Sequence, residues 1–467
     1  MTDTNRKLER SMTPLTVWAL AVGCMIGWGA FVMPGDTFLL KAGPVGTAIA
    51  MLISAFMMTV ISYNYNYMIN KFPVAGGAFI YTKATYGNTH GFICAWFLSL
   101  AYLAIVPLNG MALALVSRSL MGDIFRVGFH YTSAGSEVYL GEILLGAAVL
   151  VFFGILSIRG VKFSGIFDTV LVIALILGVG VFLSASLFSE KSSFANLKPF
   201  FSPKNPKIGS ILSIAAVAPW AFSGYETIPQ AVEEFKFSHK KTQHIMASSI
   251  MVGAVVYIIL NIATVMTIPE GYTDWTAYIK EAPSMTGVAA LPTFYASYML
   301  MGKAGLIFLG VSVMSAILSS IIGFYMATSR LLYSMSNEGV LPAWFGSIHQ
   351  KYRTPANSII FIMAVSLIAL PLGRTALGWI VNLSAVGASI GFLYTSCAAL
   401  KYSRQEKNRK VIFSSSLGLF FSTLFVILLI FPIPGFDCSL NLPSFICMMI
   451  WIALGAVFYL KRSRASL

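Results

Sequence analysis

Long apolar runs dominate this sequence and leave few folds open to it. About twelve of them can cross roughly 30 Å of hydrocarbon as an α-helix, which takes about 20 residues. A helix satisfies its own backbone hydrogen bonds inside a bilayer, so the pattern predicts a multi-pass helical bundle. We expect spans at 14–40, 46–69, 92–121, 139–158, 163–188, 208–232, 246–268, 304–332, 357–372, 376–400, 411–432 and 442–460.

Composition excludes the soluble alternatives. Hydrophobic residues make up 57% of the chain and charged residues 10%, whereas a soluble domain carries about 25% charged residues. No water-soluble fold of this size covers so much apolar surface. The net charge of +14 lies in short clusters between the apolar runs. It therefore indicates membrane topology, with the lipid bilayer as partner, and no nucleic acid.

The charged clusters also orient the chain. With the N-terminus in the cytoplasm, Lys and Arg are about twice as frequent in the inner segments as in the outer ones, as the positive-inside rule requires. The loop 189–207 runs against this trend. Because the number of spans is even, both termini lie on one side. We expect a multi-pass protein of the cell (plasma or inner) membrane, with a cytoplasmic segment at 1–13 and a cytoplasmic tail at 461–467.

Two spans carry residues that interrupt helices. The first contains GCMIGWG at 23–29 and the sixth contains PWAFSGYETIP at 219–229. Hydrocarbon tolerates free backbone groups only where they line a cavity. Broken helices at matching positions of two halves indicate a transporter built from inverted repeats, with its substrate at the breaks. The alternative for the first segment is a small-residue surface for close helix packing.

Four motifs, in register, resemble those of the amino acid–polyamine–organocation permeases. They are residues 23–31, the loop FPVAGGAFIY at 72–81 with its Tyr-Gly at 86–87, AFSGYE at 221–226 with an acidic exit at 233–234, and the segment 329–355. The resemblance implies an all-α polytopic membrane protein of LeuT-type fold, with about 12 transmembrane helices. Helices 1–5 (14–188) and 6–10 (208–400) would be inverted repeats, with helices 11–12 (411–460) appended.

Three positions depart from the family pattern. Trp28 stands where most members carry a small residue, beside the place of a substrate carboxylate. Ser238 replaces a proline that often follows the acidic exit of helix 6. Several proton-coupled members carry a lysine in helix 5, and the position that we match to it is Leu175.

The break in helix 1 predicts a binding site made largely of backbone atoms. Unwinding frees N–H groups from Gly27 to Ala30 at the positive end of a half-helix, which suits a carboxylate. Carbonyl groups around Met25 suit an ammonium group, and helix 6 repeats the arrangement. The expected substrate-binding residues are Met25, Gly27, Trp28, Gly29, Ala30, Trp220, Ser223 and Phe324.

Three of these residues are aromatic. By resemblance to the arginine/agmatine antiporters, Trp220 is a gate that stacks on a cation, and Phe324 lines the pocket. The alternative for both is packing within the bundle. Trp28 either caps the pocket or shrinks it.

Acidic residues within the spans are candidates for coupling because burying them is costly. Glu226 is either a proton carrier or gate, or holds the second half-helix in place. We expect Asp168, six residues after Lys162, at the membrane interface. Ser319 and Ser320 match the paired hydroxyls that bind Na⁺ in sodium-coupled proteins of this fold. The alternatives are close packing at these serines, coupling to H⁺, and an exchanger that needs no ion.

The sequence thus predicts a secondary active transporter that moves an amino acid or related amine across the cell membrane by alternating access. The alternatives are a polyamine or amine-product exchanger and, in another class, a non-transporting receptor or an embedded enzyme. The sequence has no His-Glu-x-x-His, phosphate-binding glycine loop or Cys/His cluster. We therefore expect no enzymatic activity, no cofactor beyond a coupling Na⁺ or H⁺, and no obligate protein partner.

Overall fold

The computed structural model describes residues 8, 10–133, 136–203, 206–373, 376–434, 436 and 438–465. Of the two expected cytoplasmic segments, residues 1–7, 9, 466 and 467 lie outside this part. The helices are α1 (Pro14–Met25), α2 (Gly29–Met33), α3 (Leu39–Lys71), α4 (Ala78–Tyr86), α5 (Asn88–Met121), α6 (Leu140–Ile158), α7 (Val161–Phe188), α8 (Lys207–Ala215), α9 (Ala218–Ala221), α10 (Thr242–Met266), α11 (Trp275–Glu281), α12 (Pro292–Met301), α13 (Lys303–Asn337), α14 (Ala356–Ala369), α15 (Ala376–Gln405), α16 (Arg409–Ile430) and α17 (Leu442–Ala465).

Membrane-length helices confirm the prediction of an all-α polytopic membrane protein. In the described residues, nine helices are long and apolar enough to cross a bilayer, and α8 with the segment Ala218–Glu234 forms a further span bent by 42°. The helix Gly29–Lys71 turns at Gly43, whose φ of 75° lies in the left-handed region that favours glycine. Its first part continues the short helix α1. With α1 and the short helix Ala356–Leu372, every expected span has its helix.

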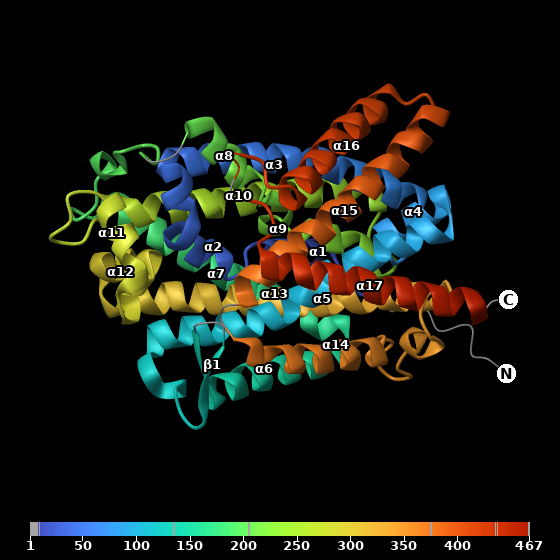
Figure 1. The fold of residues 1–467 in the computed structure, drawn as a ribbon, viewed down its shortest axis with the longest axis horizontal. Coiled ribbons are helices and arrows are strands. Elements are labelled where there is room, and N and C mark those ends of the chain that lie inside the picture. The colour runs from blue at the N-terminus through green and yellow to red at the C-terminus, as the bar shows by residue number, and fades with distance from the viewer. Residues whose placement is uncertain are drawn as a thin grey trace.

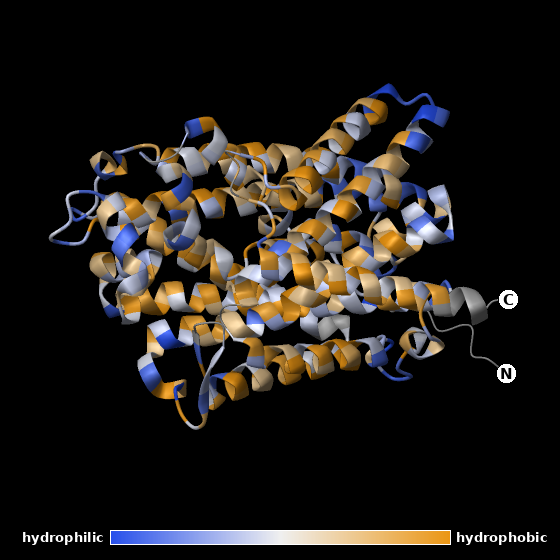
Figure 2. Cartoon of the chain, in the orientation of Figure 1, coloured by the Kyte–Doolittle hydropathy of each residue, from blue (hydrophilic) through white to orange (hydrophobic). Residues whose placement is uncertain are grey.

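The spans end on two opposite sides of the bundle. On the side that we call terminal, the Met12 N–H donates to the Glu234 carbonyl, and the hydroxyls of Thr89 and Tyr459 are hydrogen-bonded. α11, α12 and β1 lie at the opposite, distal end (Figure 1). Hydrophilic residues gather toward these two ends, and hydrophobic ones fill the helices between them (Figure 2).

A short hairpin on the distal side has no counterpart among the expected elements. β1 (His130–Ser133) pairs antiparallel with β2 (Ser136–Tyr139) between α5 and α6. Strands of four residues are too short to show a clear alternation of apolar and polar side chains. The C-terminal helix α17 also runs to Ala465, so the tail expected from 461 begins within a helix.

The centre of the bundle forms around α1. This helix begins at Pro14, where the Thr13 hydroxyl accepts a hydrogen bond from the Thr16 N–H, a normal N-cap. Its second half is buried, and it packs against α7, α10 and α13. The bend between α8 and α9 is followed along the chain by α9 and then by η4, a 3₁₀ segment (Tyr225–Glu234) that contacts α1.

Candidate functional site

The first span is interrupted between α1 and α2. α1 ends at Met25, and Ile26 turns the chain out of the helix with φ −92° and ψ 68°. In the described part of the chain, the N–H groups of Gly27, Trp28 and Gly29 find no hydrogen-bond acceptor. The Ala30 N–H, expected to be free, donates instead to the Gly27 carbonyl at 3.2 Å. Three adjacent donors therefore remain at this break, rather than four.

Carbonyl groups are released on the other side of the same break. In a continuous helix, the carbonyls of residues 23–25 would accept from the N–H groups of residues 27–29. Those bonds are not made. The last helical hydrogen bond of α1 runs from the Ile26 N–H to the Val22 carbonyl, at 2.8 Å. One break thus exposes unpaired donors and unpaired acceptors, which are partial positive and negative charges.

The second break is tied together by Glu226. α9 ends at Ala221, and η4 begins after Gly224. The buried Glu226 carboxylate accepts from the Ser223 hydroxyl at 2.6 Å and from the Gly224 N–H at 2.8 Å. Each of its oxygens therefore has a partner. Of the two roles left open for Glu226, this geometry favours positioning the start of the second half-helix.

The two breaks are in direct contact through Gly224. Its φ is 153°, and a Cβ there would lie 2.8 Å from the Ala21 carbonyl oxygen, the Cys24 Cβ and the Met25 nitrogen. A side chain at this position would therefore separate the two interrupted helices. Glycine allows both breaks to lie at one point in the middle of the bundle.

A central cavity lies where the breaks meet. It has an empty volume of about 310 Å³. Seven of the eight expected binding residues line it, and the eighth, Ala30, does not. Glu226, the candidate for gating or proton coupling, does not line it either. The lining residues are Cys24, Met25, Gly27, Trp28, Gly29, Ile105, Leu108, Asn109, Trp220, Ser223, Tyr257, Ser320 and Phe324.

The glycines of the first break differ in what they face. A Cβ on Gly27 would meet no atom within 4 Å, so this position faces open space. A Cβ on Gly29 would lie 2.3 Å from the Trp220 ring. The indoles of Trp28 and Trp220 meet edge to face, with their centroids 6.3 Å apart. The two indoles therefore close the cavity over Gly29.

Two polar side chains of the cavity are absent from the sequence-based prediction. Asn109 on α5 donates through Nδ2 to the Ile105 carbonyl at 2.9 Å and to the Ser320 hydroxyl at 3.0 Å. Its Oδ1 is buried and has no hydrogen-bond partner. The Tyr257 hydroxyl on α10 likewise bonds to no described residue. A lone asparagine inside an apolar run was the signal available for Asn109.

The two adjacent serines on α13 face different neighbours. Ser320 accepts from Asn109 at the cavity, whereas the Ser319 hydroxyl donates to the Asp168 carboxylate on α7. The Asp168 side chain is fully buried inside the bundle, and its expected place at the membrane interface stays a prediction. Asp168 is seven residues into α7, or about 10 Å along its axis, where α1 and α13 pack over that helix.

A wide vestibule opens on the distal side of the cavity. Its empty volume is about 1270 Å³, and Trp28 belongs to both spaces. Asp36, Lys41, Gly378 and Asn382 are among its lining residues. The Trp28 side chain therefore separates the vestibule from the central cavity.

The terminal side is closed by a buried ion pair. Arg330 on α13 donates to Glu234 through Nε at 2.8 Å and through Nη2 at 3.2 Å, and both side chains are 1% exposed. Glu233 accepts from the Ala75 N–H at 3.0 Å, and the Ser334 hydroxyl donates to the Ala75 carbonyl. These contacts join η4, α13 and the loop before α4 beneath the cavity.

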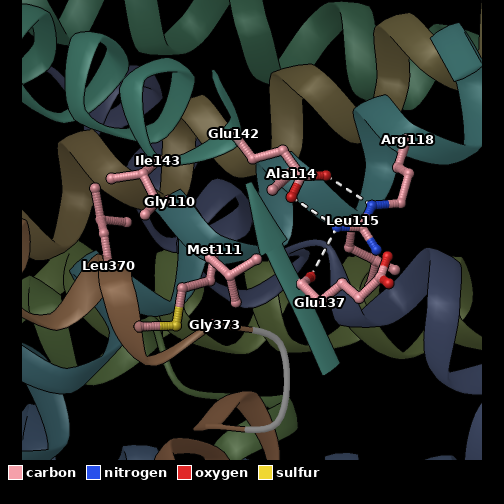
Figure 3. A pocket seen from close by; sticks show the side chains of 11 residues that line it. Gly110, Met111, Ala114, Leu115, Arg118, Glu137, Glu142, Ile143, Leu370 and Gly373 are labelled. Atoms are coloured by element: carbon pink, nitrogen blue, oxygen red, sulfur yellow. Dashed lines mark hydrogen bonds and ion pairs between the residues drawn. The ribbon is translucent and has the colours of Figure 1, made fainter. Parts of the chain in front are cut away.

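Another pocket lies between α5, α6 and the hairpin, as Figure 3 shows, with an empty volume of about 460 Å³. Arg118 makes two bonds of 2.6 Å to the Glu142 carboxylate and one of 3.0 Å to the Glu137 carbonyl. The ion pair neutralises its own charges, and much of the remaining lining is apolar. No residue of either helix break reaches this pocket, so it is not the candidate site.

Known proteins match almost the whole chain. The sequence profile of a family described as amino acid permease covers residues 12–454. A methylthioribose transporter of Bacillus subtilis (strain 168) is 25% identical over 98% of this chain and 95% of its own. A low-affinity putrescine importer of Escherichia coli (strain K12) is 23% identical, over 97% and 93%. A branched-chain amino acid permease of Lactococcus lactis subsp. cremoris (strain MG1363) is 23% identical, over 86% and 84%.

Proposed function

Because the chain belongs to the amino acid permease family and is a transporter, we propose that it is a secondary active transporter that moves an amino acid or related amine by alternating access. The observation that carries this proposal is the central cavity, where two interrupted helices meet and leave backbone groups unpaired. A non-transporting receptor and an embedded enzyme do not fit the family.

The chemistry of the break matches a zwitterion. A substrate carboxylate accepts from the N–H groups of Gly27, Trp28 and Gly29, which lie at the positive end of α2. The ammonium group donates to the carbonyls of residues 23–25 and to Asn109 Oδ1. Each of these atoms is unpaired among the described residues, so binding a substrate costs no existing hydrogen bond there.

The open distal side and the closed terminal side support an outward-facing state of the transport cycle. The vestibule reaches Trp28 from the distal side, while the Arg330–Glu234 pair closes the terminal side. With both termini in the cytoplasm of a cell-membrane protein, as the charge bias predicts, the distal side faces outward. Alternating access then requires movement of one repeat, 14–188, against the other, 208–400.

A polyamine or amine-product exchanger is the second candidate. The two indoles beside the cavity provide aromatic faces for a cation, and one relative is named for putrescine import. Another relative is named for methylthioribose, which has neither a carboxylate nor an amino group. The substrate panel must therefore extend beyond amino acids.

Counterflow in proteoliposomes tests the proposal. Vesicles holding purified protein are loaded with an unlabelled mixture of amino acids, putrescine and methylthioribose, and one labelled compound at a time is added outside. We expect transient accumulation of one class of label without any ion gradient. Protein-free vesicles are the control.

The result separates the candidates. Accumulation of a labelled amino acid supports the first candidate, and accumulation of putrescine alone supports the amine exchanger. Binding of a label to the folded protein without counterflow would contradict alternating access.

A further inference from the structure

Asp168 is a buried carboxyl group that the proposed substrate site does not use. Its side chain has no exposed surface. Oδ1 accepts the hydroxyl hydrogen of Ser319, and Oδ2 is buried with no hydrogen-bond partner. No basic side chain in the described part of the chain forms an ion pair with it.

The helices packed against α7 place no charge near Asp168. They are α1, α6, α10, α12 and α13. α6 carries Glu142 at its distal end, where it pairs with Arg118. α10 carries His244, which is exposed whereas Asp168 is fully buried, and α12 carries no charged residue. α13 carries Lys303 and Arg330, which are 16 and 11 residues from Ser319, or about 24 Å and 16 Å along the axis.

The remaining titratable group near Asp168 is a thiol. Cys24 of α1 is buried and directly follows Gly23, the residue whose position lies against Ser319. Its sulfur also lies against α13, where it occupies the place that a Cβ on Gly323 would take.

An ionised carboxylate is strongly disfavoured in such surroundings. A charge removed from water without a partner is costly, and a buried acid without a counter-charge takes up a proton instead. A hard cation such as Na⁺ would need several oxygen ligands around a void. The central cavity is lined by Ser320, and neither Ser319 nor Asp168 reaches it. The site therefore suits a proton better than a metal ion.

The position of Asp168 connects it to the helix break. A Cβ on Gly23 would lie 1.7 Å from the Ser319 oxygen and 3.0 Å from Val172, which is one turn beyond Asp168. The Asp168–Ser319 pair thus lies directly against the last turn of α1 before the break. Movement of α1 away from α7 and α13 would expose the carboxyl to water, where its ionised form is favoured.

We propose that Asp168 is the proton-binding residue that couples transport to a proton gradient. The carboxyl holds its proton while α1 covers it. When α1 moves, the O–H bond at Asp168 breaks, the proton passes to water and the carboxylate remains, until a proton from the other side restores the acid. This inference rests on the proposed transport function and names its coupling group.

The test compares gradient-free exchange with gradient-driven uptake. The substrate is the label that shows counterflow in the wild type, and the variant is Asp168→Asn, which keeps the size and the acceptor for Ser319 but cannot ionise. We expect wild-type vesicles to accumulate the label when the outside is more acidic, without Na⁺. Asp168→Asn should keep counterflow within about twofold and lose all gradient-driven accumulation.

Two further variants and one direct measurement control the test. Thr169→Val changes the neighbouring residue, whose hydroxyl bonds within its own helix to Gly165, and should behave as wild type. Asp168→Glu restores a titratable group and should regain part of the gradient-driven uptake. A pH-sensitive dye inside wild-type vesicles should report acidification during uptake, which needs no variant to fold.

Failure of this inference is distinguishable from failure of the transport proposal. Wild-type counterflow without any proton movement, or accumulation driven by Na⁺ alone, would overturn the role of Asp168 and leave transport intact. Retained acid-driven accumulation in Asp168→Asn would overturn it too, as would loss of counterflow in folded Asp168→Asn. Absence of counterflow in the wild type concerns the proposed function instead.

Discussion

Gly27 allows the candidate site to be tested with little disturbance of the fold. A Cβ there meets open space, and the residue does not have a positive φ. Gly27→Val should therefore fold normally while its side chain fills the cavity beside the free N–H groups. A hydrogen bond to a charged group contributes about 1.5–3 kcal/mol, so we expect affinity for the transported label to fall at least tenfold. Equilibrium binding to purified protein measures this.

Gly180→Val is the matched control for that variant. Gly180 is exposed on α7, and a Cβ there also meets no atom within 4 Å. It should keep wild-type affinity and thermal stability. If Gly27→Val bound the label as tightly as Gly180→Val does, the helix 1 break would not be the substrate site. Gly29 is a poorer probe, because its substitution would displace Trp220.

Single residues show where sequence reasoning reached its limit. Glycines and prolines in the sequence indicate a helix break. The residues beside the two breaks meet at the cavity. Asn109 lies in an unbroken helix, so nothing local to it indicates which face it presents. The distance of Asp168 from Lys162 along the chain suggests an interface, but its burial depends on α1 and α13, which are distant in sequence.

At the scale of elements, the Arg330–Glu234 pair joins η4 to α13. Removing one partner of a buried pair leaves an uncompensated charge, which costs about 3–5 kcal/mol. We expect Glu234→Gln to lower the free energy of unfolding by about 3 kcal/mol. The double variant Glu234→Leu with Arg330→Met should regain most of this loss, because neither charge remains. Thermal unfolding of the purified protein in detergent compares them.

The single variants Glu234→Leu and Arg330→Met complete a double-mutant cycle with the double variant. If the double variant lost as much stability as both single variants together, the two side chains would not stabilise one another. The same pair lies on the closed side of the cavity, so opening that side must separate it. A folded double variant is therefore expected to open more readily toward the terminal side.

The sequence predicted the long helices and missed the short elements. Each apolar run of the sequence has its helix, because crossing a bilayer demands both length and hydrophobicity. The hairpin and the short helices α4, α11 and α12 lie in connecting segments and leave no comparable pattern. The match to the permease family confirms the resemblance drawn from the motifs. The division into two inverted repeats stays a prediction.

At the scale of the whole molecule, the vestibule predicts that water-soluble reagents reach its lining residues from the distal side only. Gly378 lines it, and a Cβ there meets open space. Gly378→Cys, made in a Cys438→Ser background because Cys438 lines the same space, should react with a membrane-impermeant maleimide added outside intact cells. Reaction requires the thiolate, which forms in water and not in lipid. Labelling followed by mass spectrometry measures it.

Gly180→Cys supplies the control in the same background. It has equal room for a side chain but lies on the outer surface of α7, so the impermeant reagent should leave it unmodified. Reaction of Gly378→Cys from the cytoplasmic side alone would reverse the orientation that the charge bias predicts. The label on Gly378→Cys should also block counterflow, because it fills the approach to Trp28.

The unpaired N–H groups at residues 27–29 have a consequence for how such a protein diversifies over evolutionary time. This anchor of main-chain atoms keeps its N–H groups under any substitution except proline, although a bulky side chain at Gly27 can block access to it. Mutations at Asn109, Tyr257 or Phe324 can then alter the remainder of the pocket while the anchor persists. A descendant gene can thus acquire a new cargo by gradual steps, each passing through a working protein.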